Sequence, residues 1–323
     1  MRLGVDLGGT KIEAVVIDES GDECWRQRVS TPQGDYDATL DAIAWLVKEG
    51  KRTVGICSSA AIGIGTPGAE TSDGKMKNCN STALNGRFLR RDLSQLLNSP
   101  VKIANDANCF ALAEAHSGQG RQASVCKSEG EPSRPFPSVV FGVILGTGVG
   151  GGIVVNGTLL TGPNAIAGEW GHNPMPLQGE AFGSGSVERR PCYCGRVNCV
   201  ETFLSGPGLA LSYQQRFGEV LTPEEIIEHM RNSEGQDQEN AVLIWREYMQ
   251  QLAAALAQVV NILDPSLIVL GGGLSAVSEI YQDIVPLMKS HVFTDEFNTP
   301  ILPALLGDSA GVYGAAWLVD EVT

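Results

Sequence analysis

Residues 2–17 read RLGVDLGGTKIEAVVI, and this stretch predicts the fold. Apolar and β-branched residues on both sides of a Gly-Gly-Thr turn are typical of two strands joined in a hairpin. The pattern occurs again at residues 139–155, VVFGVILGTGVGGGIVV, where we expect a strand, a glycine-rich turn over residues 146–152 and a second strand. An internal repeat of this kind predicts two similar lobes, each opening with a hairpin.

The rest of the chain alternates between strands and helices. Helical spacing predicts helices over residues 36–49, 207–217, 223–232, 240–262 and 311–319, and short strands are expected at 61–64, 101–104 and 267–270. Alternation with buried apolar runs predicts an α/β fold. We expect a small first lobe at residues 1–115 plus 306–323 and a larger second lobe at 116–305. Residues 117–137, rich in Ser, Gly, Glu and Pro, predict a mobile surface excursion and interlobe linker.

Composition narrows the class of protein. The chain has 323 residues, of which 43% are hydrophobic, and a formal net charge of −14. A globular composition is indicated, and the acidic charge opposes binding to nucleic acid or to an anionic membrane surface. With no signal peptide and no apolar run of membrane-spanning length, we expect a cytoplasmic protein with reduced cysteines. Scattered cysteines are expected to be packing residues: Cys24, Cys57, Cys79, Cys109 and Cys126.

Two glycine turns and a glycine triplet are the candidate nucleotide-binding segments. Glycine lets backbone amides approach an anion closely, and the amides can bind phosphate oxygens. A hairpin turn needs glycine in any case, so the first turn alone leaves both interpretations open. A second turn in the equivalent place of the second lobe favours a clamp on a polyphosphate chain. The candidates are Asp6, for a magnesium-bound water, and Gly8, Gly9, Thr10, Lys11, Gly146, Thr147, Gly148, Gly271, Gly272 and Gly273.

Asn105 and Asp106 follow a predicted strand and precede a predicted helix. This position is the carboxyl edge of a sheet, where ligand sites of α/β proteins occur. Asn and Asp also cap helices, and one of the two can cap while the other acts. A carboxylate near a phosphate clamp suits a general base for a substrate hydroxyl.

The segments GEWGH (residues 168–172) and CYCGRVNCVE (residues 192–201) predict a metal site. His172, Cys192, Cys194 and Cys199 can close a tetrahedral Zn²⁺ site, and four protein ligands imply a structural site without an open position. A buried histidine and a disulfide are the alternatives, and a reducing compartment disfavours the disulfide. Glu169 and Glu201 stand beside the ligands, so a metal would position both acids.

Together these segments resemble the ROK family (repressors, open reading frames, kinases), which includes bacterial sugar kinases. The resemblance runs from residues 6–11 to Gly314 and implies the actin-like, hexokinase-like ATPase fold, with two α/β lobes around a central cleft and a duplicated ribonuclease H-like motif. It implies Asp106 as the catalytic base, with sugar hydroxyls held by Asn105, Glu169, His172 and Glu201. His172 would bind zinc with one ring nitrogen and the sugar with the other. ATP with Mg²⁺ would lie between the two glycine turns and beside the Gly271 turn, and a homodimer is expected.

Within the family, NCNSTALNG (residues 78–86) and WGHNP (residues 170–174) are similar to fructokinases (manno-fructokinases). We therefore expect ATP-dependent phosphorylation of D-fructose at its 6-hydroxyl, with Asn80 as a specificity residue. The alternatives within the family are an N-acetylglucosamine kinase and a glucokinase. A sugar-responsive transcriptional regulator is disfavoured, because the first strand begins next to Met1 and leaves no room for a helix-turn-helix domain. A sugar-binding protein without catalysis is disfavoured by Asp6, Asp106 and the two turns.

Two segments depart from the family pattern. The excursion at residues 117–137 and the interval between His172 and Cys192 are longer than usual. The second departure lies closer to the expected pocket rim, and it bears on the choice of sugar more than on the kinase prediction.

Overall fold

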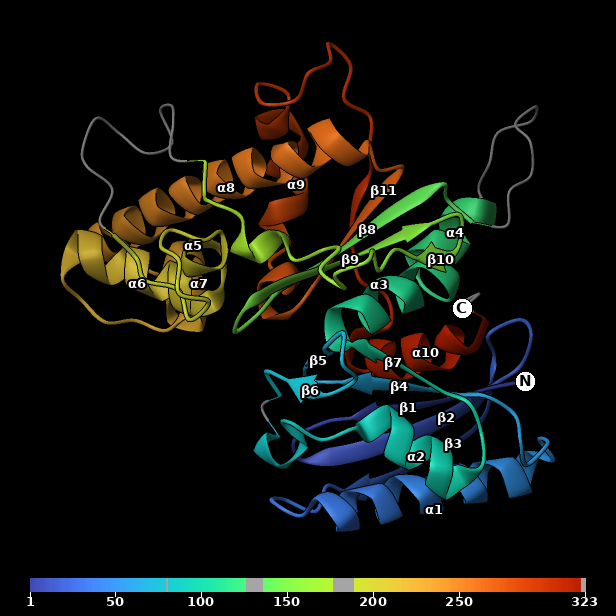
Figure 1. Cartoon of the computed structure of the whole chain (residues 1–323). Coiled ribbons are helices and arrows are strands. Elements are labelled where there is room, and N and C mark those ends of the chain that lie inside the picture. The colour runs from blue at the N-terminus through green and yellow to red at the C-terminus, as the bar shows by residue number, and fades with distance from the viewer. Residues whose placement is uncertain (80, 126–135, 177–188, 321–323) are drawn as a thin grey trace. The chain divides into compact units, whose positions relative to one another are not determined.

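The computed structural model describes residues 1–79, 81–125, 136–176 and 189–320 (Figure 1). The chain divides into two compact units. The first contains Met1–Gly142, Gly152–Ala167 and Leu305–Thr323, and the second contains Val143–Gly151 and Gly168–Ala304. The C-terminal segment, Leu305–Thr323, belongs to the same unit as the N-terminal sheet. Residues 116–142 and 152–167 also belong to the first unit, whereas the functional lobe boundary at residue 115 stays a prediction.

The first unit is built on a five-stranded sheet of order β3-β2-β1-β4-β7. β1 pairs antiparallel with β2, and β2 with β3, whereas β4 lies parallel to β1 and β7 parallel to β4. The strands are β1 (Arg2–Leu7), β2 (Lys11–Ile17), β3 (Glu23–Ser30), β4 (Ile62–Thr66) and β7 (Val101–Asn105). The predicted opening hairpin is thus present, with its turn at residues 8–10.

Helices cover both faces of this sheet (Figure 1). α1 (Tyr36–Val54) and α2 (Leu89–Leu97) pack on one face, and α10 (Ala310–Trp317) with α3 (Asp106–His116) on the other. α10 lies close to the strands because glycine replaces a side chain there. A Cβ on Gly4 or Gly63 would collide with the α10 backbone, and one on Gly314 would collide with α3. Apolar residues of β1, β2 and α1 fill the space beneath.

The segment that we predicted to be a mobile linker is partly helical. α4 (Gln119–Val125) follows α3 directly, and the amide of Gln119 donates to Glu114 Oε2 at 3.0 Å. Gly120 packs on the backbone of Ala115, where a Cβ would not fit. The prediction was wrong for residues 119–125 because close glycine packing outweighs the polar composition. Residues 126–135 of the excursion lie outside the described residues.

The second sheet has the order β10-β9-β8-β11-β12, which repeats the order of the first. Its strands are β8 (Val139–Leu145), β9 (Val149–Val155), β10 (Thr158–Leu159), β11 (Leu267–Gly271) and β12 (Ile301–Pro303). In each sheet an antiparallel hairpin arm precedes strands that pair in parallel. The predicted duplication is therefore visible in the topology. The predicted turn at residues 146–152 is shorter, since β9 already begins at Val149.

The second unit carries most of the remaining helices. α8 (Gln236–Leu263) packs on α6 (Gly206–Phe217), α7 (Pro223–Asn232) and α9 (Glu279–Met288) (Figure 1). α7 begins with a capping box, because the Thr222 hydroxyl accepts from the Glu225 amide and the Glu225 carboxylate accepts from the Thr222 amide. The predicted helices at 207–217, 223–232 and 240–262 are confirmed within a few residues at each end.

Shorter elements complete the described chain. They are β5 (Ala69–Glu70), β6 (Met76–Lys77), α5 (Glu201–Leu204) and the 3₁₀ turns η1 (Thr82–Leu84), η2 (Trp170–His172), η4 (Gly273–Ala276), η5 (Gly307–Ser309) and η6 (Leu318–Asp320). None of the helices described is long and apolar enough to cross a bilayer. Cys79 and Cys109 are buried packing residues as expected, but Cys24 and Cys57 are exposed. Cys126 lies outside the described residues.

Candidate active site

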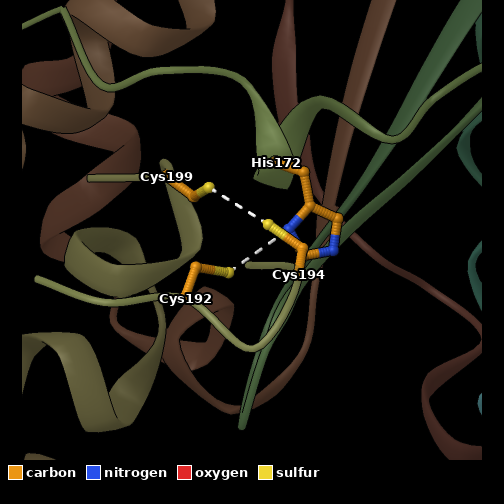
Figure 2. Close-up of side chains that lie close together, drawn as sticks. All are labelled: His172, Cys192, Cys194 and Cys199. Atoms are coloured by element: carbon orange, nitrogen blue, oxygen red, sulfur yellow. Dashed lines mark hydrogen bonds between the residues drawn. The ribbon is translucent and has the colours of Figure 1, made fainter. Parts of the chain in front are cut away.

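One histidine and three cysteines converge in the second unit (Figure 2). The ligand atoms of His172, Cys192, Cys194 and Cys199 all lie within 4.8 Å of one another. His172 Nδ1 is 3.6 Å from Cys192 Sγ, and Cys194 Sγ is 3.6 Å from Cys199 Sγ. In a tetrahedral zinc site, Zn–S and Zn–N bond lengths give S–S edges of about 3.8 Å and N–S edges of about 3.6 Å. The donor set and its spacing fit a closed zinc site.

Backbone hydrogen bonds shape the loop that carries the thiols. The amide of Cys192 donates to the carbonyl of Arg196 at 2.9 Å, and Gly195 returns the chain with a φ of 86°. On the other side, the amide of Val200 donates to Asn173 O at 2.9 Å, which joins the cysteine loop to the segment after His172. Hydrogen bonds centred on the Arg196 amide lower the pKa of the Cys194 thiol to about 6, which favours the thiolate that binds metal.

The second ring nitrogen of His172 also has a partner. His172 Nε2 lies 2.9 Å from the Tyr193 hydroxyl, and the two rings meet edge to face. With a metal on Nδ1, Nε2 would carry the ring proton and donate to the phenol oxygen. Tyr193 was not among the predicted site residues, although its position between two candidate ligands could have indicated it. Its pKa is raised to about 12 by partial desolvation and by the carboxylates of Glu201 and Glu169.

The first glycine turn leaves two backbone amides unengaged. The Gly8 amide donates to Lys11 O at 3.0 Å and closes the turn, while the Gly8 carbonyl accepts from the Thr31 hydroxyl at 2.7 Å. No hydrogen bond within the described ranges uses the amides of Gly9 and Thr10. A Cβ on Gly9 would have only Ser81 Oγ near it, at 3.9 Å. The turn therefore offers two amide donors, as an anion site requires.

Asp6 lies among other acids at the end of β1. The pKa of Asp6 is raised to about 6 by burial, with further contributions from Glu13 and Asp106. Glu13 is neutralised by Arg26 and Arg28, which donate to its Oε1 at 2.7 and 2.8 Å. Asp6 and Asp106 remain close enough to repel, and the nearby Lys11 offsets this repulsion only in part. A cation between or beside them would relieve that repulsion, so they fit a magnesium site.

The sequence left open which of Asn105 and Asp106 caps the helix and which is available for chemistry. The Asn105 side chain caps α3 by accepting from the Asn108 amide at 2.9 Å. Asp106, the first residue of α3, is exposed, and its Oδ1 accepts from the Ala107 amide at 2.8 Å. Although it is accessible, desolvation by the surrounding protein raises its pKa. Asn105 thus provides the cap, and the Asp106 carboxylate is available for chemistry.

The second glycine turn adjoins the glycine triplet within the second unit. The Gly146 amide donates to Gly148 O at 3.0 Å and closes the turn. A Cβ on Gly272, which has a φ of 84°, would lie 2.5 Å from the carbonyl oxygen of Leu145, the residue before the turn. Two predicted nucleotide-binding segments are therefore packed together. Gly271 itself ends β11, and Gly273 begins a 3₁₀ turn.

The other predicted sugar-binding residues lie close to the metal cluster or outside the described residues. Glu169 precedes the 3₁₀ turn of His172 and is exposed. Glu201 begins α5, two residues after Cys199, and its Oε2 accepts from the Val149 amide at 3.0 Å. Asn80 lies outside the described residues, as do residues 177–188, which contain most of the interval between His172 and Cys192.

Comparison with known proteins supports one family over the whole chain. The model of the "ROK family" matches residues 2–322. An N-acetyl-D-glucosamine kinase of Pectobacterium atrosepticum is 40% identical over 319 residues, which cover 98% of each chain.

Two solved structures are similar over nearly the same length. A ROK hexokinase from Thermus thermophilus has a TM-score of 0.79 and 26% identity, covering 98% of this chain and 96% of that one. A ROK family glucokinase from Streptomyces griseus, in complex with glucose and AMPPNP, has a TM-score of 0.66 and 28% identity, covering 98% of both chains. The predicted hexokinase-like α/β fold is confirmed, and the chain belongs to the ROK family.

Proposed function

We propose that the protein is an ATP-dependent kinase that transfers the γ-phosphate of ATP to the 6-hydroxyl of N-acetyl-D-glucosamine. The observation that carries this proposal is the identity of 40% to an N-acetyl-D-glucosamine kinase over 98% of the chain. Our prediction of fructose rested on residues 78–86 and 170–174, and the relatives give it no support. The proposal therefore replaces fructose by N-acetylglucosamine, one of the alternatives, and keeps ATP-dependent phosphorylation as the reaction.

Asp106 is the proposed catalytic base. Its carboxylate would accept the proton of the sugar hydroxyl as the hydroxyl oxygen attacks the γ-phosphorus. Because desolvation raises the pKa of Asp106, its carboxylate is a stronger base than that of an ordinary aspartate. This suits a residue that must take up a proton during turnover. The side chain is accessible to a substrate and is not used to cap α3.

Main-chain amides are the proposed phosphate ligands. Gly9 and Thr10 offer theirs in the first turn, and Thr147 and Gly148 in the second, because no hydrogen bond of the described residues engages them. Such donors stabilise charge on the transferred phosphoryl group without adding a cation to the site. When bound, Mg²⁺ would neutralise phosphate charge, and Asp6 is the residue that would hold it through water.

The sugar hydroxyls are assigned to the residues around the metal cluster and at the start of α3. Glu169 and Glu201 would accept hydrogen bonds from sugar hydroxyls, and Asn105 and the His172 ring are further proposed sugar ligands. To bind the sugar, His172 Nε2 would exchange the Tyr193 hydroxyl for a sugar hydroxyl. Asn80 is proposed as a specificity residue. Zinc bound to His172 and the three thiols would hold the imidazole and both acids in position, and four protein ligands leave it no catalytic role.

A sugar panel tests the proposed function. Coupled ADP release should be measured with ATP, Mg²⁺ and each of N-acetylglucosamine, glucose, mannose and fructose. N-acetylglucosamine should give the highest kcat/KM, by at least about tenfold. A preference for fructose would restore the first prediction. The absence of turnover with every sugar would reject the kinase assignment.

The variant Asp106→Asn tests the base. The amide keeps the size of the side chain but cannot take up the proton, so kcat should fall by about 10²–10⁴-fold while sugar affinity stays within about tenfold. Asp41→Asn, an exposed position on α1, is the matched control. Near-normal kcat in Asp106→Asn would remove this residue from the chemistry.

A further inference from the structure

The second glycine turn is held in shape by a side chain from another element. Glu201, the first residue of α5, accepts from the Val149 amide through Oε2 at 3.0 Å. The same oxygen would lie 2.7 Å from a Cβ on Gly148. The carboxylate therefore fills the space that glycine leaves open, and it lies directly against the turn.

A second contact holds the other end of the turn. The Gly206 amide, at the start of α6, donates to Gly146 O at 2.8 Å. With the Gly146 amide bonded to Gly148 O and the Val149 amide bonded to Glu201, the remaining donors are the amides of Thr147 and Gly148. Glu201 thereby helps to decide which amides the turn presents to an anion.

The other carboxylate oxygen of Glu201 is free for a different partner. Within the ranges that the structure describes, Oε1 makes no hydrogen bond, and the side chain is only partly buried. Glu201 also follows the metal ligand Cys199 by two residues, so its backbone is anchored by the cysteine loop. One carboxylate thus has one oxygen committed to the glycine turn and one available to a ligand.

We propose that Glu201 is a positioning residue for the nucleotide, and that its carboxylate couples sugar binding to nucleotide binding. One oxygen holds the 146–149 turn in the form that presents the Thr147 and Gly148 amides, while the other takes a hexose hydroxyl. The hydroxyl fixes the carboxylate and spreads its negative charge, which favours an anionic phosphate nearby. By linkage, each ligand then raises the affinity for the other by the same factor. The inference rests on the proposed function for the identity of the two ligands.

Calorimetry on the full chain tests the coupling. The Kd of AMPPNP with Mg²⁺ should be measured without sugar and with saturating N-acetylglucosamine. In the wild-type protein the sugar should lower this Kd by at least about fivefold. In Glu201→Ala the Kd without sugar should rise by at least about tenfold, as expected when a charge-assisted hydrogen bond is lost, and the effect of sugar should disappear.

Glu169→Ala is the matched control, because Glu169 is the other acid beside the metal ligands and makes no hydrogen bond to the turn through its side chain in the described structure. It should weaken sugar binding but leave the sugar-free Kd of AMPPNP within about twofold. Equal nucleotide affinity in the two variants would overturn the inference and leave Glu201 a sugar ligand only. Failure of the wild-type protein to phosphorylate any sugar would instead reject the proposed function, while the sugar-free nucleotide Kd still decides the role of Glu201.

Gly148→Ala separates positioning from loss of the fold. The added Cβ would push the Glu201 carboxylate away from the turn without removing it. This variant should lose nucleotide affinity as Glu201→Ala does, with the melting temperature nearly unchanged. Normal nucleotide affinity in a folded Gly148→Ala protein would contradict the proposal.

Discussion

The Asp6 carboxylate lies close to two glycines and to other acidic side chains. A Cβ on Gly311 would lie 2.9 Å from Asp6 Oδ2, and one on Gly65 would lie 3.5 Å from Oδ1. Because neither glycine has a side chain, the Asp6 carboxylate fits between β4 and α10. Burial and the nearby acids raise its pKa from 3.8 to about 6, so the ionised form is held at a free-energy cost to the fold. Strain of this kind is expected where a protein prepares a cation site.

The raised pKa of Asp6 predicts a change in stability whose size depends on pH. The folded state binds the Asp6 proton more tightly than the unfolded chain, so the free energy of unfolding falls as pH rises from 3.8 to about 6 and stays low above that. Asp6→Asn removes the charge, and it should be more stable than the wild type by about 2 kcal/mol near pH 8 but by much less near pH 4. Urea denaturation at both pH values measures the difference. An equal gain at both would show that charge is not the cause. Turnover should be lost in either case, since magnesium binding needs the carboxylate.

At the scale of an element, the end of β11 depends on one glycine. Gly272 has a φ of 84°, and its Cβ position lies 2.5 Å from Leu145 O and 2.6 Å from Leu145 C. Backbone, unlike the end of a side chain, has little freedom to move away. The packing of β11 against the end of β8 therefore requires glycine at this position.

Gly272→Ala should lower the free energy of unfolding by at least about 2 kcal/mol, because it adds both a collision and a strained backbone conformation. Gly273→Ala is the control, since its Cβ position has no atom within 4 Å and its φ is not positive. Chemical denaturation of both variants makes the comparison. Equal stability of the two would mean that the strand end can shift to accept a side chain.

The cysteine loop gives a second prediction at this scale. The four convergent donors of the loop and His172 are expected to hold it through a metal. Cys194→Ser should abolish binding of about one zinc per chain and lower Tm by several degrees. Cys57→Ser, at an exposed cysteine outside the cluster, should keep both. Elemental analysis and a thermal melt make the measurement, and metal-free wild-type protein of unchanged Tm would argue against the zinc site.

At the scale of the whole molecule, Glu114 joins segments that are far apart in the chain. Its side chain is fully buried, with 0% exposure, and its Oε1 accepts from the amides of Leu305 and Leu306 at 2.9 Å, across 191 residues. Its Oε2 accepts from the Gln119 amide at 3.0 Å. One carboxylate thus receives three backbone donors and fixes the return of the C-terminal segment to the first unit.

Glu114→Ala should lower the free energy of unfolding by about 3 kcal/mol, because it removes the acceptor of one buried and two part-buried hydrogen bonds from backbone amides. The loss should be accompanied by faster hydrogen exchange at residues 305 and 306, which places the effect at the returning segment. Glu114→Gln keeps one acceptor oxygen and should cost less. If Glu114→Ala is as stable as the wild type, another group must satisfy the amides.

Local patterns in the sequence determined much of this protein. The hairpins, the helices of the second unit and the donor set of the metal site follow from hydrophobic period, glycine position and cysteine spacing, which act over a few residues. The repeat of a hairpin with a glycine turn was enough to predict two similar lobes, whereas the shared strand order of the two sheets came from the structure. The choice of fructose was made on two short segments, and such segments carry little information about a pocket that many distant side chains shape.

Only the tertiary structure decided which distant groups meet. It brings His172 to a thiol twenty residues later, Glu201 to the Val149 amide and the Asp6 carboxylate to the repulsive field of Asp106. It also turned the polar segment after His116 into a helix, because Gly120 packs against Ala115. Contacts of this kind depend on how whole elements pack and on shape at the level of a single Cβ. A pattern that repeats every two or four residues determines which face of an element is buried, but not which atom of another element it will meet.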